Sequence, residues 1–344
     1  MHAFHDRRKE KELVILALAR YSPFNETAQD AAHRAPAARF DLTGKPMTTE
    51  IRSNQFASLS NGTRLHYASA GTPGRPLLLF AHGFPEFWYE WHAQLAEFGS
   101  DYFAVAPDLR GFNLSDMPAD VADYKAKFVV DDLRLLAAQL GYEKFTLVAH
   151  DWGGAIAWNF AIAFPQLLSK LIIINAPHPY VFMQALKTDP IQIAASEYMN
   201  WFRAPDTEQV LSANNFEVMD TLFAGAGQPF PDWYDGDTRR KYHACWSHGL
   251  RGGLNYYRAS PLHPPTELHP GPLRLQLNPD DFRIHVPTRV IWGESDTALS
   301  TVLVDGLDQV IGDLKIERIA EGSHWVIHEQ TERVNRLIRA FLQD

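Results

Sequence analysis

The chain has 344 residues, of which 46% are hydrophobic and 21% are charged, a composition typical of one large or two modest globular domains. It excludes wholesale disorder, collagen-like repeats and a long coiled coil. A net charge of −9, without a basic run beyond Arg7, Arg8 and Lys9, argues against a nucleic-acid partner.

The single cysteine, Cys245, excludes an intrachain disulfide and any metal site built from several cysteines. One thiol fits a reducing compartment, so we expect a cytoplasmic protein. The chain has no apolar run near the roughly 18–20 residues that cross a bilayer. We therefore expect no stable membrane insertion.

Residues 1–46 differ from the rest of the chain. Mixed charges at residues 9–12 precede an apolar run at residues 13–19, and together they imitate a secretory signal. Because the run is short and acidic residues lie beside it, we favour a helical or disordered extension over a signal peptide. Met47 is an alternative native start.

Strand and helix patterns alternate from about residue 54. The turn Asn61-Gly62 between residues 56–60 and 63–69 predicts a hairpin. Short apolar runs predict buried strands at residues 76–81, 102–106, 145–149 and 171–175. Apolar spacing predicts helices at residues 126–140 and 155–164. This order predicts a parallel sheet covered by helices on both faces.

The alternation stops between residues 178 and 282, which are rich in aromatic and helix-like stretches without strong strand patterns. It resumes with strands at residues 288–292 and 314–319, a helix near residues 302–310 and a final helix at about residues 329–342. We predict a core of residues 47–177 and 283–344, into which residues 178–282 insert as a helical cap with its linker.

Asp151 lies between a predicted strand and a predicted helix, in the sequence AHDWGG of residues 149–154. The spacing matches the G-x-S-x-G nucleophile elbow, in which a strained turn presents the central side chain and small residues let the helix pack closely. The alternative is that Asp151 only caps the helix. Because further catalytic residue types follow, we favour Asp151 as a nucleophile.

The loop HGFPE of residues 82–86 follows another predicted strand. A loop in this position can present a backbone N–H to an oxyanion. We expect the N–H groups of Phe84 and Trp152 to form that oxyanion hole. His82 competes as a catalytic base, but we expect it to bond the loop backbone.

An acid and a histidine follow two later strands. Asp296 is predicted to orient the histidine, with Glu294 as the competing carboxylate. His324 is predicted to be the general base. The order nucleophile, acid, histidine is that of α/β-hydrolases. We expect His328, one turn further, to be a surface or capping residue.

Residues 54–342 resemble the α/β-hydrolase superfamily and, within it, the epoxide hydrolases. The resemblance rests on HGFPE at 82–86, DLRGF at 108–112 and HDWGG at 150–154. It implies an α/β fold with a mostly parallel eight-stranded sheet, helices on both faces and an inserted helical cap.

The resemblance also implies cap tyrosines that hydrogen-bond the epoxide oxygen. Tyr257, in the segment NYYR, falls on the matching position. Tyr198 is the nearest candidate for a second tyrosine, because Trp201 stands where some members have one. We expect Trp152 and Trp201 to contact the substrate.

An aspartate at the elbow determines the reaction type. A carboxylate that attacks an ester makes an anhydride, whereas attack on a saturated carbon makes an alkyl ester that water can hydrolyse. Asp151 therefore predicts opening of a small apolar epoxide to a vicinal diol, with water activated by His324 and Asp296. This chemistry needs no metal or organic cofactor.

Two alternatives remain at this point. A haloalkane or haloacid dehalogenase uses the same nucleophile, and Trp152 and Trp201 are candidate donors to its halide. A non-catalytic binding module is the other alternative, but it need not keep Asp151, Asp296 and His324 together. We expect a monomer or a homodimer.

Overall fold

Eight strands form one sheet in the order β1-β2-β4-β3-β5-β6-β7-β8 in the computed structural model, which describes residues 49–224 and 228–344. The strands are β1 Ile51–Ser58, β2 Arg64–Ala70, β3 Leu77–Ala81, β4 Phe103–Pro107, β5 Phe145–His150, β6 Leu168–Ile174, β7 Thr288–Gly293 and β8 Leu314–Ile319. β2 pairs antiparallel with β1 and β4, and all other neighbours are parallel. The predicted α/β-hydrolase fold is confirmed, whereas the predicted extension at residues 1–46 lies outside the described residues.

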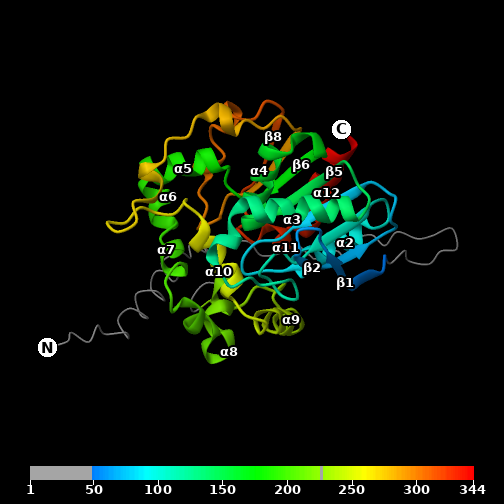
Figure 1. Ribbon diagram of the computed structural model, residues 1–344, viewed down its shortest axis with the longest axis horizontal. Coiled ribbons are helices and arrows are strands. Elements are labelled where there is room, and N and C mark those ends of the chain that lie inside the picture. Colours follow the sequence, from blue (N-terminus) through cyan, green and yellow to red (C-terminus); the bar gives the residue numbers. More distant parts are fainter. Residues whose placement is uncertain (1–48, 225–227) are drawn as a thin grey trace.

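Helices cover the sheet, and those from α5 to α10 lie between β6 and β7 in the sequence (Figure 1). They are α2 His92–Phe98, α3 Ala126–Gln139, α4 Asp151–Ala163, α5 Pro179–Thr188, α6 Pro190–Ala195, α7 Tyr198–Phe202, α8 Thr207–Ala224, α9 Gly236–Trp246, α10 Arg251–Ala259, α11 Val326–Glu329 and α12 Thr331–Gln343. α5 to α10 all belong to the insertion that we keep as the proposed cap. None of the helices in the described ranges is long and apolar enough to span a bilayer.

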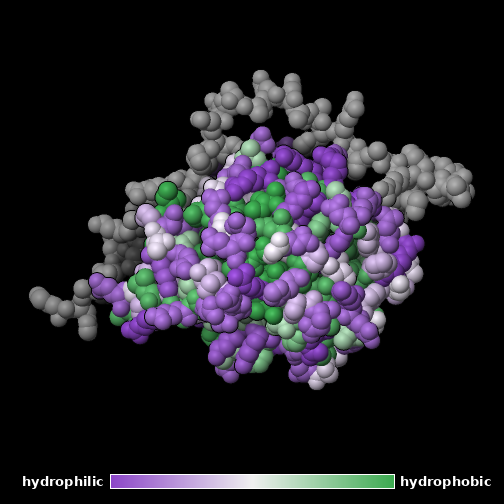
Figure 2. Space-filling model, turned by 90° about the horizontal axis from the view of Figure 1, so that it is seen from above, coloured by the Kyte–Doolittle hydropathy of each residue, from purple (hydrophilic) through white to green (hydrophobic). Residues whose placement is uncertain are grey.

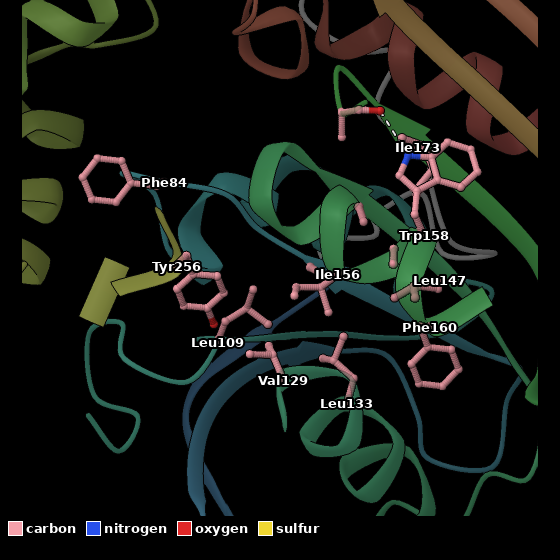
Figure 3. Close-up of a cluster of buried hydrophobic side chains, with 14 of the residues drawn as sticks. Phe84, Leu109, Val129, Leu133, Leu147, Ile156, Trp158, Phe160, Ile173 and Tyr256 are labelled. Carbon is pink, nitrogen blue, oxygen red and sulfur yellow. Dashed lines mark hydrogen bonds between the residues drawn. The ribbon is translucent and has the colours of Figure 1, made fainter. Parts of the chain in front are cut away.

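Two hydrophobic cores lie on opposite faces of the sheet, because successive side chains of a strand point to opposite sides. Leu79 of β3 belongs to the core under α3 and α4, and Phe80 belongs to the core under α2 and α12. Figure 3 shows the first core, where Ile156 of α4 points toward Val129 and Leu133 of α3. Burial on both faces explains the continuous apolar strands in the sequence.

The prediction of a helix near residues 302–310 is wrong. Two short 3₁₀ turns, Thr301–Leu303 and Leu307–Gln309, replace it. Gly306 between them has a φ of +81°, a left-handed conformation that interrupts a right-handed helix. The apolar side chains of Leu303 and Leu307 are nevertheless buried. The hydrophobic spacing therefore indicated correctly which side chains are buried, although it did not indicate a helix.

The linker that returns from the insertion to β7 exposes apolar side chains, of which Leu268 is 86% exposed. Figure 2 shows one face of the molecule, where hydrophobic residues gather near the centre and hydrophilic residues surround them.

Parallel strands β3, β5, β6, β7 and β8 end at one edge of the sheet. The loops after these strands therefore meet, as expected for a ligand site in an open α/β sheet.

Candidate active site

Asp151 is the first residue of α4, directly after β5, and its backbone has a φ of +46°. This left-handed conformation is strained for most residues with a side chain, although aspartate tolerates it better than most. The first turn of α4 packs closely against β3, because a Cβ atom at Gly153 would lie 2.1 Å from the carbonyl oxygen of Ala81. The geometry is that of a nucleophile elbow.

Two backbone N–H groups hold the carboxylate of Asp151. Phe84 donates to Oδ1 over 2.8 Å, and the N–H of Trp152 also donates to the carboxylate. Both donors come from the segments in which we predict an oxyanion hole. The predicted structural role of His82 is confirmed, since its Nε2 accepts from the N–H of Leu109 over 2.9 Å.

His324 lies between two carboxylates. Its Nδ1 is 2.7 Å from Oδ2 of Asp296, and its Nε2 is 3.7 Å from Oδ2 of Asp151. Glu294, the competing carboxylate, pairs with Arg318 over 3.1 Å instead. The structure therefore brings together the three side chains that the sequence selects.

Hydrogen bonds hold Asp296 in its ionised form. Oδ1 accepts from the N–H groups of Ala298 and Leu299, over 2.8 and 2.9 Å, and Oδ2 accepts from Nδ2 of Asn175 over 2.8 Å. Burial opposes ionisation, but His324 and these donors lower the pKa of Asp296. Sequence reasoning missed Asn175, whose only signal is a polar residue directly after a buried strand.

Asp151 and His324 shift each other's protonation. Burial raises the pKa of Asp151, and the charge of His324 and the backbone N–H groups offset part of this effect. Burial disfavours the His324 cation, but Asp296 and Asp151 outweigh it and raise its pKa to about 9. In the free site at neutral pH, His324 is therefore a cation between two acidic side chains.

A cavity of about 520 Å³ opens over Asp151, and most of the side chains that line it are apolar. Trp152, Tyr198 of α7 and Tyr257 of α10 all line it. Trp201 is not among the lining residues and packs beside its neighbour in α7. The role of Trp201 in substrate binding stays a prediction.

Tyr198 and Tyr257 form one group at the cavity that Asp151 also lines. Their ring centroids are 6.2 Å apart, and the ring of Tyr257 meets that of Trp152 edge-on at 4.9 Å. Burial raises the pKa of both Tyr198 and Tyr257, and the charge of Asp151 adds to the effect. Both hydroxyls therefore remain protonated and able to donate at neutral pH.

The expectation that His328 lies on the surface or caps a helix is wrong. Its side chain is buried, its Nε2 is 2.7 Å from Oε1 of Glu86, and its ring stacks on Trp233 of the insertion with centroids 4.1 Å apart. The insertion covers α11, which the sequence could not reveal. Sequence reasoning also missed the contact of His328 with the buried Glu86 side chain.

The comparisons with known proteins agree with this geometry. Residues 76–331 match the family model described as alpha/beta hydrolase fold. Over 291 residues the chain is 36% identical to "Epoxide hydrolase 4" of Mus musculus, which covers 83% of this chain and 77% of the mouse protein. The chain belongs to the epoxide hydrolases of the α/β hydrolase family.

Bacterial proteins are among the other relatives of this epoxide hydrolase. The chain is 35% identical over 294 residues to "AB hydrolase superfamily protein YfhM" of Bacillus subtilis, covering 84% of this chain and 98% of that protein. A crystal structure of the Bacillus megaterium epoxide hydrolase in complex with an inhibitor superposes with a TM-score of 0.75 at 34% identity, covering 84% of this chain and all of that one. These findings favour neither a dehalogenase nor a non-catalytic module.

Proposed function

We propose that this epoxide hydrolase converts a small apolar epoxide to a vicinal diol through an ester on Asp151. The Asp151 carboxylate carries the proposal, because one oxygen accepts from the Phe84 N–H, the other faces His324, and Asp151 lines a cavity together with Tyr198 and Tyr257. The mostly apolar lining favours an apolar substrate. Carboxylate attack on saturated carbon gives an ester that water can cleave.

In the first step, a carboxylate oxygen of Asp151 attacks a ring carbon of the epoxide. The new C–O ester bond forms as the ring C–O bond breaks, and the electron pair leaves on the epoxide oxygen. Tyr257 gives this oxygen its proton, with Tyr198 as a second hydrogen-bond donor. The His324 cation then returns a proton to the tyrosinate and becomes neutral.

In the second step, neutral His324 takes a proton from water, which adds to the ester carbonyl carbon of Asp151. The oxyanion forms on Oδ1, within reach of the N–H groups of Phe84 and Trp152. Collapse breaks the bond between the carbonyl carbon and the oxygen that attacked the ring carbon, and the expelled alkoxide, which keeps that oxygen, takes the proton of the new carboxyl group. The diol leaves, and the Asp151 carboxylate and the His324 cation are restored.

The two steps are expected to respond differently to pH. The Asp151 charge is one cause of the raised His324 pKa, and esterification removes that charge. We therefore expect ester hydrolysis to increase with pH about a midpoint below 9, whereas ring opening, which uses protonated His324, lacks this increase. Single-turnover rates of the two steps across pH measure it. A midpoint at or above that of the free enzyme contradicts this assignment of His324.

Tyr257→Phe is expected to slow ring opening by roughly 100-fold, because general acid catalysis of this kind contributes about 10²–10⁴-fold. Hydrolysis of the ester should change little, since the tyrosine acts on the epoxide oxygen. Rapid quenching of single turnovers separates the two rates. Tyr180→Phe is the matched control, because Tyr180 is not among the residues that line the cavity and its hydroxyl accepts an exposed hydrogen bond from Gln184. A loss confined to ester hydrolysis would contradict the assignment.

The proposed reaction is tested with purified protein and a series of aryl and alkyl epoxides, with diol as the measured product. Haloalkanes and haloacids are assayed in parallel for halide release. We expect diol and no comparable halide. Halide release without diol anywhere in the series would instead establish a dehalogenase.

We also propose that the protein is a monomer or a homodimer and that it lies in the cytoplasm. A monomer or homodimer is consistent with a site whose catalytic side chains all come from one chain. The cytoplasm is consistent with the single thiol, Cys245, which is free and buried.

A further inference from the structure

A buried group of titratable side chains lies behind Asp151 and takes no part in the steps above. It consists of Glu86 from the loop after β3, Glu90 from the 3₁₀ turn Trp88–Trp91, and His150 at the end of β5. Each of the three residues is at most 1% exposed. Such a group is costly to bury unless its charges and hydrogen bonds are satisfied.

The tautomer of His150 follows from its neighbours. Its Nε2 lies 3.0 Å from the carbonyl oxygen of His324, and a carbonyl oxygen only accepts, so Nε2 carries the hydrogen. Burial lowers the pKa of His150 to about 3, so the ring is neutral. Nδ1 is therefore an unprotonated acceptor.

Nδ1 of His150 faces two further acceptors. Oε1 of Glu90 lies 2.9 Å away and Oε2 of Glu86 lies 3.7 Å away. No hydrogen-bond donor among residues 49–224 and 228–344 reaches any of these three atoms. These three buried acceptor atoms lie within 4.8 Å of one another and repel one another, so the group needs a proton or a cation between them.

The two carboxyl groups differ in their other contacts. Oε1 of Glu86 receives the Tyr242 hydroxyl over 2.5 Å and lies 2.7 Å from Nε2 of His328. Burial opposes the charge of Glu86, but His328 and the Tyr242 hydroxyl lower its pKa. Glu86 therefore carries the negative charge of the pair.

Glu90 has weaker support for a charge. Its Oε2 accepts a single hydrogen bond, from the N–H of Gly83 over 3.1 Å. Burial, the charge of Glu86 and the charge of Asp151 raise the pKa of Glu90 well above its usual range, against that one N–H. Of the two carboxyl groups, Glu90 is the one that keeps a proton.

We propose that Glu90 is a neutral acid in the working enzyme and that its proton lies between Oε1 and Nδ1 of His150. This proton would complete a chain of hydrogen bonds from the Gly83 N–H through Glu90 and His150 to the His324 carbonyl oxygen. The chain joins the loop of Phe84, the elbow of Asp151 and the loop of His324. Glu90 is thus a positioning residue for the reaction proposed above, on which this role rests.

Glutamine and methionine at position 90 form a matched pair, because both approximate the length of glutamate. Glutamine keeps a carbonyl oxygen for Gly83 and an N–H for His150, whereas methionine offers neither. We expect Glu90→Met to lower kcat by roughly tenfold or more, the effect of an unsatisfied buried acceptor. Glu90→Gln should recover most of the wild-type rate. Equal losses in both variants would overturn the proposal.

The stability of the variants tests the proton without reference to catalysis. A carboxyl group whose pKa is raised on folding destabilises the protein as pH rises above its unfolded value, near 4.5. The Tm of Glu90→Gln minus that of the wild type should therefore increase from pH 5 to pH 8. Glu143→Gln, at an exposed position, should show no such increase. A difference that decreases with pH would mean that Glu90 is ionised.

Infrared spectroscopy detects the proton directly. The carbonyl stretch of a protonated carboxylic acid, present at neutral pH in wild type and absent from Glu90→Gln, supports the proposal; its absence from wild type overturns it. Metal analysis of the purified enzyme must give no stoichiometric divalent cation, since a cation bound among the same three atoms would also overturn it. Neither measurement depends on turnover, so failure of the proposed reaction is distinguishable from failure of this inference.

Discussion

Replacing Asp151 with asparagine is expected to lower kcat by roughly 10⁴-fold, the scale of losing a catalytic nucleophile. The amide of asparagine cannot displace an epoxide oxygen, although it fills the same volume. Asparagine also tolerates the left-handed backbone at φ +46°, so the elbow should keep its conformation. Diol formation is the measurement, on protein whose peptide masses show that the introduced asparagine has not deamidated.

The comparison variant is Asp151→Ala, which removes the same carboxylate but places alanine in a left-handed conformation that it adopts poorly. Both variants should be inactive, and only the alanine variant should also lose thermal stability. Retention of substantial activity in freshly prepared Asp151→Asn, without deamidation, would remove Asp151 from its role.

The second large effect is expected from His324→Gln. Without a base, water cannot attack the ester efficiently, so kcat should drop by roughly 10³–10⁴-fold. Asp151 and the tyrosines open the ring, and solvent can return to the tyrosinate the proton that the His324 cation otherwise supplies, so one round of ester formation should still occur. Intact-protein mass spectrometry should then show a covalent adduct that is heavier than the free protein by the mass of the epoxide.

The double variant Asp151→Asn, His324→Gln is the control, and it should form no adduct. Peptide mapping should place the modification of the single variant on Asp151. If the single variant binds substrate, shown by equilibrium titration, and yet gains no mass, the ester route is wrong.

The sequence predicted most of the sheet because its strands are buried on both faces and therefore apolar throughout. β3, β5, β6 and β7 lie within a few residues of the predicted strands. The spacing of apolar residues was less informative where the backbone conformation interrupts a helix. At Gly306 a positive φ divides the predicted helix into two short turns. Periodicity reports which side chains are buried, and it does not report the backbone between them.

Site residues were predictable from the sequence where they directly follow predicted strands. Asp151, Asp296 and His324 follow three strands, and the carboxyl ends of these strands meet in a doubly wound sheet. Asn175, Glu90 and the buried position of His328 were not predictable, because their partners lie far away in the chain. The contact between His328 and Trp233 depends on how the insertion covers the core, which no local pattern encodes.

The pairing of β6 with β7 has a consequence for how this scaffold can diversify. The two strands are parallel neighbours, with Ile174 beside Ile291, so the insertion leaves at the carboxyl end of β6 and the chain returns to form the strand next to it. The length and sequence of the insertion can change without separating the strand ends that hold the aspartate, the histidine and their acid. Evolution can therefore change the insertion that covers the cavity, and with it the substrate preference, while the positions of the catalytic side chains stay the same.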